Sequence, residues 1–311
     1  IMKELKGLFT ALVTPFNENG IDIQGLKENI ESQIENGVDG IFVLGTTGES
    51  PTLTKKERNE VIHTAVETAQ KRVPVLVGTG TNCTKTTYER TEDAKNLGAD
   101  CAVIVLPYYN RPTQEGIYRH IHAVHSNVEF PLCLYNVPKR TGITLEFETI
   151  LRLAALPRVI GLKDCTGDLK QLKDIIKALS EIDTSFSILS GDDYLCSAMI
   201  QQGARGLMSV ASNLIPKTIS QLVHSCLNGD TSTRDQLQLR LLPLFNALSL
   251  ESNPIPIKTA MNLWGLPAGP CRLPLCEMNK KNLNALAHQL KEYENLKPFK
   301  DLEKQKIKSL A

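Results

Sequence analysis

The sequence predicts a (β/α)8 barrel, the TIM-barrel fold class, followed by a C-terminal helical region. Two observations predict it. Short apolar runs alternate eight times with segments of helical periodicity, and the strand signal stops after Asn228. The length agrees, because 311 residues accommodate a barrel of about 250 residues and an extension. We therefore expect a barrel over residues 1–229 and a helical region over residues 230–311.

Eight runs of mostly apolar residues are the expected strands. Most of them lack strict alternation of polar and apolar residues, which is typical of parallel strands covered on both faces. In chain order they are residues 8–16, 40–44, 73–77, 102–106, 131–136, 159–163, 186–189 and 206–210. A doubly wound sheet is the alternative. Its glycine-rich fingerprint is missing from the first strand-to-helix turn, TPFNENGID.

Apolar residues at helical spacing separate the strands. Residues 23–34 and 61–69 each carry one apolar stripe. Thr54 and Glu57 fit a capping box at the start of the second stripe. Pro216 suits the first position of a later helix, since its missing N–H would be unpaired there anyway.

The expected C-terminal region contains two more helical stripes, at residues 237–248 and 283–290. Between them, residues 253–265 are expected to form a proline-rich corner that leads into a short helix. This region adds helices to the barrel and no strand.

Composition and charge exclude several function classes. Lys and Arg number 35 against 34 Asp and Glu, so the basic excess of a nucleic-acid binder is missing. No apolar run approaches the roughly 18 residues of a membrane-spanning helix, and no basic-then-apolar leader opens the chain. The 8 cysteines lack zinc-ligand spacing. We expect a cytoplasmic protein with reduced thiols, no metal, and no nucleic-acid or membrane partner.

In a barrel of this class, functional residues lie at the C-terminal ends of the strands. Lys163 is the most unusual residue there, because a lysine rarely occurs on an apolar strand. Side chains alternate along a strand, so Val159, Gly161 and Lys163 are expected to share one face. Inside the barrel, desolvation would lower the pKa of Lys163 and supply a neutral amine for Schiff-base formation. The alternative is a lysine paired with an acid such as Asp164.

Other polar residues follow neighbouring strands. The turn at residues 45–49 places two hydroxyls between glycines, which suits a carboxylate or phosphate but also a purely structural turn. Tyr135 could carry a proton or pack in the core. Arg140 could hold a substrate carboxylate or lie on the surface. Together with Lys163, these residues suggest an aldolase that acts on a keto acid.

Five motifs occur in the order of a known family: GTTGES, LPYYNRP, YNVPKRTG, GLKD and NPIPIK. With them the chain resembles the dihydrodipicolinate synthase and N-acetylneuraminate lyase superfamily of class I aldolases. The resemblance extends from Thr10 to Leu275. It implies a barrel fold and a catalytic lysine at position 163.

The resemblance also implies a role for each matching residue. Lys163 would form the Schiff base with pyruvate, and Thr46 and Thr47 would bind its carboxylate. Thr46, Tyr135 and Tyr109 would relay protons, with Tyr109 donated by a neighbouring subunit. The family is typically a homotetramer of two tight dimers. It needs neither a metal nor an organic cofactor, because the imine itself accepts the electrons.

Gly191 and Met208 would contribute backbone contacts near the imine. The second substrate follows from one further matching position. In the synthases of the family, an arginine at position 140 grips the carboxylate of aspartate semialdehyde, and the sialic-acid lyases lack it. We therefore expect condensation of pyruvate with L-aspartate 4-semialdehyde to 4-hydroxy-tetrahydrodipicolinate. Cleavage of N-acetylneuraminate or a 2-keto-3-deoxy sugar acid is an alternative, and a non-catalytic ligand-binding relative is a more remote one.

Many bacterial members of the family bind lysine as a feedback inhibitor at the dimer interface. The matching positions here are Ser50, Asn82 and Tyr108. The usual acidic residue is replaced by Thr86, and Lys55 and Arg58 stand where sensitive enzymes often have histidine. Added positive charge opposes the lysine ammonium. We expect weak or absent feedback by lysine.

Overall fold

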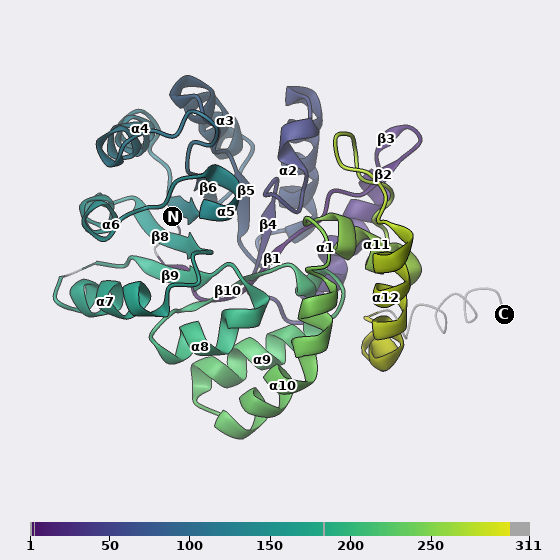
Figure 1. The fold of residues 1–311 in the computed structure, drawn as a ribbon. Coiled ribbons are helices and arrows are strands. Elements are labelled where there is room, and N and C mark those ends of the chain that lie inside the picture. Colours follow the sequence, from purple (N-terminus) through teal and green to yellow (C-terminus); the bar gives the residue numbers. More distant parts are fainter. Residues whose placement is uncertain (1, 3, 183, 299–311) are drawn as a thin grey trace.

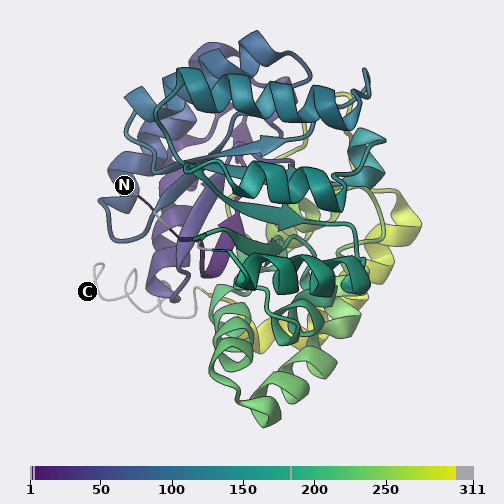
Figure 2. The ribbon, with the colours of Figure 1, turned by 90° about the vertical axis from the view of Figure 1, so that its left-hand side faces the viewer.

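The computed structural model of the chain is a closed barrel of eight parallel strands surrounded by helices (Figures 1 and 2). It describes residues 2, 4–182 and 184–298. The strand order is β1-β10-β9-β8-β7-β6-β5-β4, and β4 pairs with β1 to close the barrel. The closure confirms the predicted (β/α)8 fold and excludes the doubly wound sheet, which is open.

The barrel strands are short, and their residues are almost all buried. They are β1 (Gly7–Ala11), β4 (Gly40–Val43), β5 (Val75–Gly78), β6 (Cys101–Val105), β7 (Leu132–Asn136), β8 (Val159–Asp164), β9 (Ser187–Ser190) and β10 (Gly206–Ser209). The first strand is shorter than the predicted residues 8–16. Pro15 cannot donate to a ladder, and the chain after it forms a small antiparallel pair, β2 (Phe16–Asn17) and β3 (Gly20–Ile21).

Helices follow the strands and cover the outside of the barrel. They are α1 (Ile23–Glu35), α2 (Lys55–Ala69), α3 (Thr84–Asn96), α4 (Gln114–Asn127), α5 (Pro138–Thr141), α6 (Phe147–Ala154), α7 (Leu169–Ser180), α8 (Cys196–Gln201) and α9 (Pro216–Asn228). Four 3-10 turns accompany them: η1 (Ser50–Thr52), η2 (Asp193–Leu195), η3 (Ala211–Asn213) and η4 (Lys291–Leu296). The capping box of Thr54 and Glu57 is present at the start of α2, and α9 begins at Pro216. Both sequence predictions are confirmed.

Three helices make up the described part of the C-terminal region: α10 (Thr231–Ala247), α11 (Ile255–Leu263) and α12 (Lys280–Leu290). Helix α10 packs against α9 and α12, and α11 packs against α12 and η3 (Figure 1). The end of the predicted region, residues 299–311, lies outside the described residues. The division at residue 229 stays a prediction. Within residues 2, 4–182 and 184–298, none of the helices combines the length and apolarity needed to cross a bilayer.

Two apolar cores result, one inside the barrel and one between strands and helices. Strand β8 contributes to both in an unexpected way. Leu132 pairs with Val159, but the next residue, Cys133, pairs with Gly161. This bulge places Ile160 in the inner core and Val159 in the outer one. The prediction that Val159 shares the face of Lys163 is therefore wrong, because the bulge reverses the alternation below Gly161.

Candidate active site

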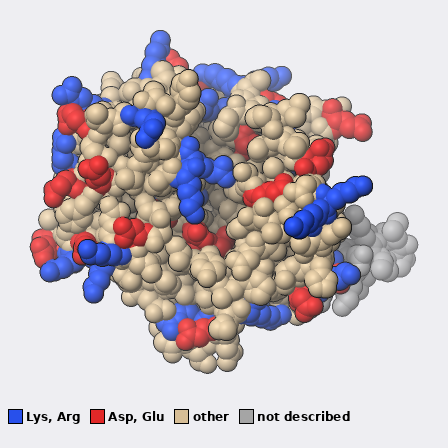
Figure 3. Space-filling model, viewed as in Figure 1, with Lys and Arg blue, Asp and Glu red and all other residues tan. Residues whose placement is uncertain are grey.

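The carboxyl ends of the barrel strands open into a cavity of about 450 Å³. Viewed from the side shown in Figure 1, the surface is hollowed near its centre (Figure 3). The predicted site residues that line the cavity are Thr46, Thr47, Tyr135, Arg140, Lys163 and Gly191. They come from the ends of β4, β7, β8 and β9, so the closure of the barrel brings together residues that are far apart in the sequence.

Lys163 lies near the end of β8 and only 4% of its surface is exposed. Its Nζ is 4.5 Å from the centre of the Tyr135 ring and 5.3 Å from that of Phe42. Asp164 does not pair with it. The Asp164 carboxylate instead accepts a hydrogen bond of 2.7 Å from the Thr166 hydroxyl, because alternation turns it to the opposite face of the strand. The alternative of a paired lysine is thus excluded.

The electrostatics of Lys163 favour the uncharged amine. Burial lowers the pKa of Lys163 below its ordinary value of 10.5, since desolvation penalises the ammonium, and the charge of Arg140 acts in the same direction. Asp193 opposes the shift from across the cavity. No carboxylate lies within ion-pair distance of Lys163 in the part of the chain that the structure describes. A neutral amine at the mouth of the barrel can attack a carbonyl.

Tyr135 is the cross-strand neighbour of Lys163, since the two residues pair in the β7–β8 register. The side chain is 6% exposed. Burial raises the pKa of Tyr135 well above its usual value, and the Thr46 side chain acts in the opposite direction. The phenol is therefore protonated at neutral pH and lies beside both Lys163 and Thr46, where it can donate and accept protons.

Cys165 also lines the cavity, and sequence reasoning did not single it out. It stands two residues after Lys163, so the alternation of the strand was a signal that could have found it. A Cβ at Gly191 would clash with Cys165 Sγ and would lie 2.8 Å from Lys163 Cε. Glycine at position 191 is thus required for both side chains to fit. Burial raises the pKa of Cys165 to about 11, so its thiol is neutral near pH 7.

Thr46 and Thr47 occupy the tight turn between β4 and η1. Glu49 donates its N–H to the Thr46 carbonyl over 3.1 Å and adopts a left-handed conformation with φ of 51°. The hydroxyl of Thr47 accepts a hydrogen bond of 2.9 Å from Asn253 Nδ2. Backbone amides and hydroxyls of such a turn suit a carboxylate.

Arg140 extends from α5 over the cavity and is exposed. Its Nη2 donates to the backbone carbonyl of Asn253 over 3.1 Å. Asn253 therefore contacts both Thr47 and Arg140, although sequence reasoning assigned it no role. Its buried Oδ1 has no hydrogen-bond partner among the described residues. Only its place in the NPIPIK motif pointed to the site.

The structure does not bring every predicted residue to the cavity. Met208 is fully buried in the inner core, and the described lining of the cavity does not include it. Tyr109 is 90% exposed after β6 and is also absent from that lining. Its backbone adopts the left-handed conformation, with a φ of 71°.

Of the predicted regulatory residues, two line a cavity and the third does not. Ser50 and Tyr108 line a second cavity of about 420 Å³, which shares Thr46, Tyr135 and Arg140 with the first. Asn82 is not part of that described lining, and its carbonyl accepts a hydrogen bond of 2.8 Å from Asn110 Nδ2. In the described ranges, no three His, Cys, Asp or Glu side chains are grouped so that they could hold a metal ion.

A buried, unpaired lysine beside a tyrosine at the carboxyl end of a (β/α)8 barrel defines a class I, Schiff-base aldolase. Comparison with known proteins assigns the chain to a particular family within this class. The chain belongs to the dihydrodipicolinate synthetase family, whose sequence model matches residues 4–293.

Known synthases are similar to this chain in sequence over nearly its full length. The 4-hydroxy-tetrahydrodipicolinate synthase of Protochlamydia amoebophila is 47% identical over 289 residues, which cover 93% of this chain and 96% of that protein. The synthase of Methanocaldococcus jannaschii is 41% identical, with 92% and 98% covered. The crystal structure of dihydrodipicolinate synthase from Aquifex aeolicus superposes with a TM-score of 0.90 at 41% identity, covering 94% of this chain and 99% of that one.

Proposed function

We propose that this protein is a 4-hydroxy-tetrahydrodipicolinate synthase, which condenses pyruvate with L-aspartate 4-semialdehyde in lysine and diaminopimelate biosynthesis. The observation that carries the proposal is the presence of both Lys163 and Arg140 in the lining of one cavity. Lys163 provides the amine that activates a keto acid, and Arg140 provides a second cationic group that suits a carboxylate. An aldehyde that itself carries a carboxylate, such as aspartate semialdehyde, fits this arrangement.

The reaction begins with attack of the neutral Lys163 amine on C2 of pyruvate. Loss of water forms the imine, and removal of a proton from C3 gives an enamine. The enamine C3 bonds to the aldehyde carbon of the semialdehyde, whose oxygen takes up a proton. The amino group of that substrate then attacks C2 and displaces Lys163, which closes the ring. The imine accepts the electron pair throughout, so the reaction needs no other cofactor.

The remaining residues have roles that follow from their positions. The turn of Thr46 and Thr47 binds the pyruvate carboxylate. Gly191 leaves room for the Lys163 side chain and contributes backbone contacts near the imine. Thr46 and Tyr135 carry protons to and from the reacting carbons. Met208, on β10, contributes only its backbone, near the imine.

We propose a homotetramer of two tight dimers, in which Tyr109 enters the cavity of the neighbouring subunit. The exposure of Tyr109, and its absence from the described lining of the cavity of its own chain, support this assembly. A cytoplasmic location is also part of the proposal, and the eight free cysteines support it.

Pyruvate consumption by the purified protein tests the function. We expect rapid consumption with aspartate semialdehyde and none with N-acetylmannosamine, because Arg140 matches the charged aldehyde. Lys163→Ala is the control and should consume no pyruvate with either partner. Consumption with the sugar alone would retain the Schiff-base lysine but replace the substrate. Near-normal activity of the Lys163→Ala variant would refute the mechanism.

A further inference from the structure

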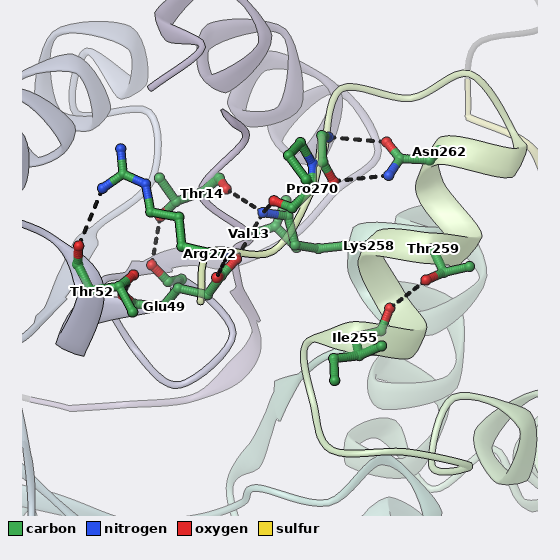
Figure 4. A network of polar contacts seen from close by, with 12 residues as sticks. Val13, Thr14, Glu49, Thr52, Ile255, Lys258, Thr259, Asn262, Pro270 and Arg272 are labelled. Carbon is green, nitrogen blue, oxygen red and sulfur yellow. Dashed lines mark hydrogen bonds and ion pairs between the residues drawn. The ribbon is translucent and has the colours of Figure 1, made fainter. Parts of the chain in front are cut away.

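A buried ion pair joins the C-terminal helix α11 to the turn that carries Thr46 and Thr47 (Figure 4). Lys258 Nζ lies 2.8 Å from Glu49 Oε1, and both side chains are only 1% exposed. The two residues are 209 positions apart in the sequence. Neither residue lines the 450 Å³ cavity that contains Lys163, although Glu49 borders the adjoining 420 Å³ cavity.

Every polar atom of this pair is satisfied. Lys258 Nζ donates to the carbonyls of Thr14 and Pro270 over 3.0 and 2.7 Å, in addition to Glu49, which uses its three donors. The second oxygen of Glu49 accepts the backbone N–H of Arg272 over 2.9 Å. Burial lowers the pKa of Lys258, and the contact with Glu49 counteracts this and favours the ammonium.

The pair acts on the turn through the backbone conformation of Glu49. Glu49 is held in the left-handed region, which is costly for a residue other than glycine and persists only where its surroundings enforce it. The same residue bonds to the Thr46 carbonyl, and Thr14 Oγ1 donates to the carbonyl of Gly48 over 2.8 Å. The conformation that presents the two threonines thus depends on how Glu49 is anchored.

Stability alone does not account for such a pair. The desolvation of two buried charges offsets much of their attraction, and apolar residues of similar size would stabilise the fold as well. An apolar pair would lack the defined geometry of hydrogen bonds, and that geometry is what holds the Glu49 backbone at one position.

We propose that Glu49 and Lys258 are positioning residues that keep the Thr46–Thr47 turn in the shape that binds the carboxylate of the keto acid. Helix α11 is then part of the first-substrate site although it lies outside the barrel. This inference rests on the proposed function for the identity of the keto acid, pyruvate. It makes a separate claim, namely that loss of the pair weakens binding of pyruvate more than binding of the aldehyde.

The variant Glu49→Gln tests the claim. Its amide keeps an acceptor for Lys258 but removes the charge and the second acceptor for Arg272. We expect KM for pyruvate to rise about tenfold, with KM for the semialdehyde within about twofold of wild type. Borohydride trapping of pyruvate on Lys163 should need a correspondingly higher pyruvate concentration. A KM for pyruvate equal to that of the wild type, or a parallel rise in KM for both substrates, would overturn the inference.

Glu57→Gln is the matched control. Glu57 pairs with the side chain of the same Arg272 and caps α2, but it does not contact the turn. This variant should lower the melting temperature and leave KM for pyruvate at the wild-type value. A rise in KM for pyruvate equal to that of Glu49→Gln would mean that general loosening explains both, and the inference would fail.

A second variant covers the case in which Glu49→Gln does not fold. The double variant Glu49→Gln with Lys258→Met leaves no buried charge unpaired and should fold, with a melting temperature lowered by the loss of the donor to the Thr14 and Pro270 carbonyls. The pyruvate concentration for half-maximal trapping should still rise about tenfold, because the direction of the contact is lost. Wild-type trapping in this folded variant would overturn the inference. Trapping needs no semialdehyde, so a wild-type protein that traps pyruvate but makes no product would refute the proposed function alone.

Discussion

Lys163 owes its chemistry to its surroundings. Its Nζ faces the rings of Tyr135 and Phe42, and neither ring can replace the water that an ammonium loses on burial. The nearest acid along the chain, Asp164, is turned away and hydrogen-bonded elsewhere. The result is a lowered pKa and a larger fraction of nucleophilic amine at neutral pH than a free lysine would have.

This shift predicts a pH dependence. The amine is reactive only when neutral, so the rate of imine formation at low pyruvate should rise with pH and level off above the pKa of Lys163. Because burial lowers that pKa, the midpoint should lie clearly below 10.5. Initial rates of cyanoborohydride trapping, measured with the Lys163→Ala protein as blank, give the midpoint. A midpoint at or above the value of free lysine would contradict the assignment.

Helices α2 and α3 carry the residues on which we expect the response to lysine to depend. Lys55 on α2 pairs with Asp93 of α3 over 2.9 Å, and Arg58 is almost fully buried on the inner face of α2. Burial lowers the pKa of Arg58 to about 10, which still leaves it cationic at neutral pH. Thr86, near the start of α3, brings no compensating carboxylate. Lys55 is offset by Asp93, so Arg58 is the cation that we expect to oppose the ammonium of a lysine ligand.

We expect millimolar lysine to inhibit the wild-type enzyme little. Thr86→Glu should lower the lysine concentration for half-inhibition by about threefold or more, because the new carboxylate attracts the ligand ammonium. Lys85→Gln changes the net charge by the same amount one residue away and should have no such effect. Inhibition curves with lysine as the only variable make the comparison. Strong inhibition of the wild type, or equal effects of the two variants, would count against this explanation.

At the scale of the whole molecule, one chain does not hold every predicted catalytic residue in its own cavity. Tyr109 is on the surface while its expected partners, Thr46 and Tyr135, line the cavity. If the assembly supplies Tyr109 from a neighbour, each site contains residues of two chains, and a C2 interface would exchange the tyrosine in both directions.

Mixed assemblies test this arrangement. Lys163→Ala and Tyr109→Phe should each be impaired as pure proteins. Co-expressed in one cell, they should form dimers in which the Tyr109→Phe subunit keeps its lysine and receives an intact tyrosine. At random pairing about a quarter of all sites would be complete. Activity of the purified mixture above the sum of its components is expected. A mixture no more active than that sum would place Tyr109 outside the neighbouring site.

The sequence alone determined the alternation of eight strands and helices, the capping box of α2 and the exceptional position of Lys163. All three are local signals. Periodicity follows from the geometry of each element, and a lysine on an apolar strand is rare whatever packs around it. The motifs then identified the family and most of the residues that line the cavity.

The tertiary structure decided what depends on contacts between distant segments. The bulge at Ile160 arises from pairing with β7 and reversed the predicted face of Val159. Asn253 reaches Thr47 across 206 positions, and Lys258 reaches Glu49 across 209. Periodicity extends over one element and cannot report such contacts. They exist only because closure of the barrel and packing of α11 bring residues 253–258 to the turn at residues 46–49.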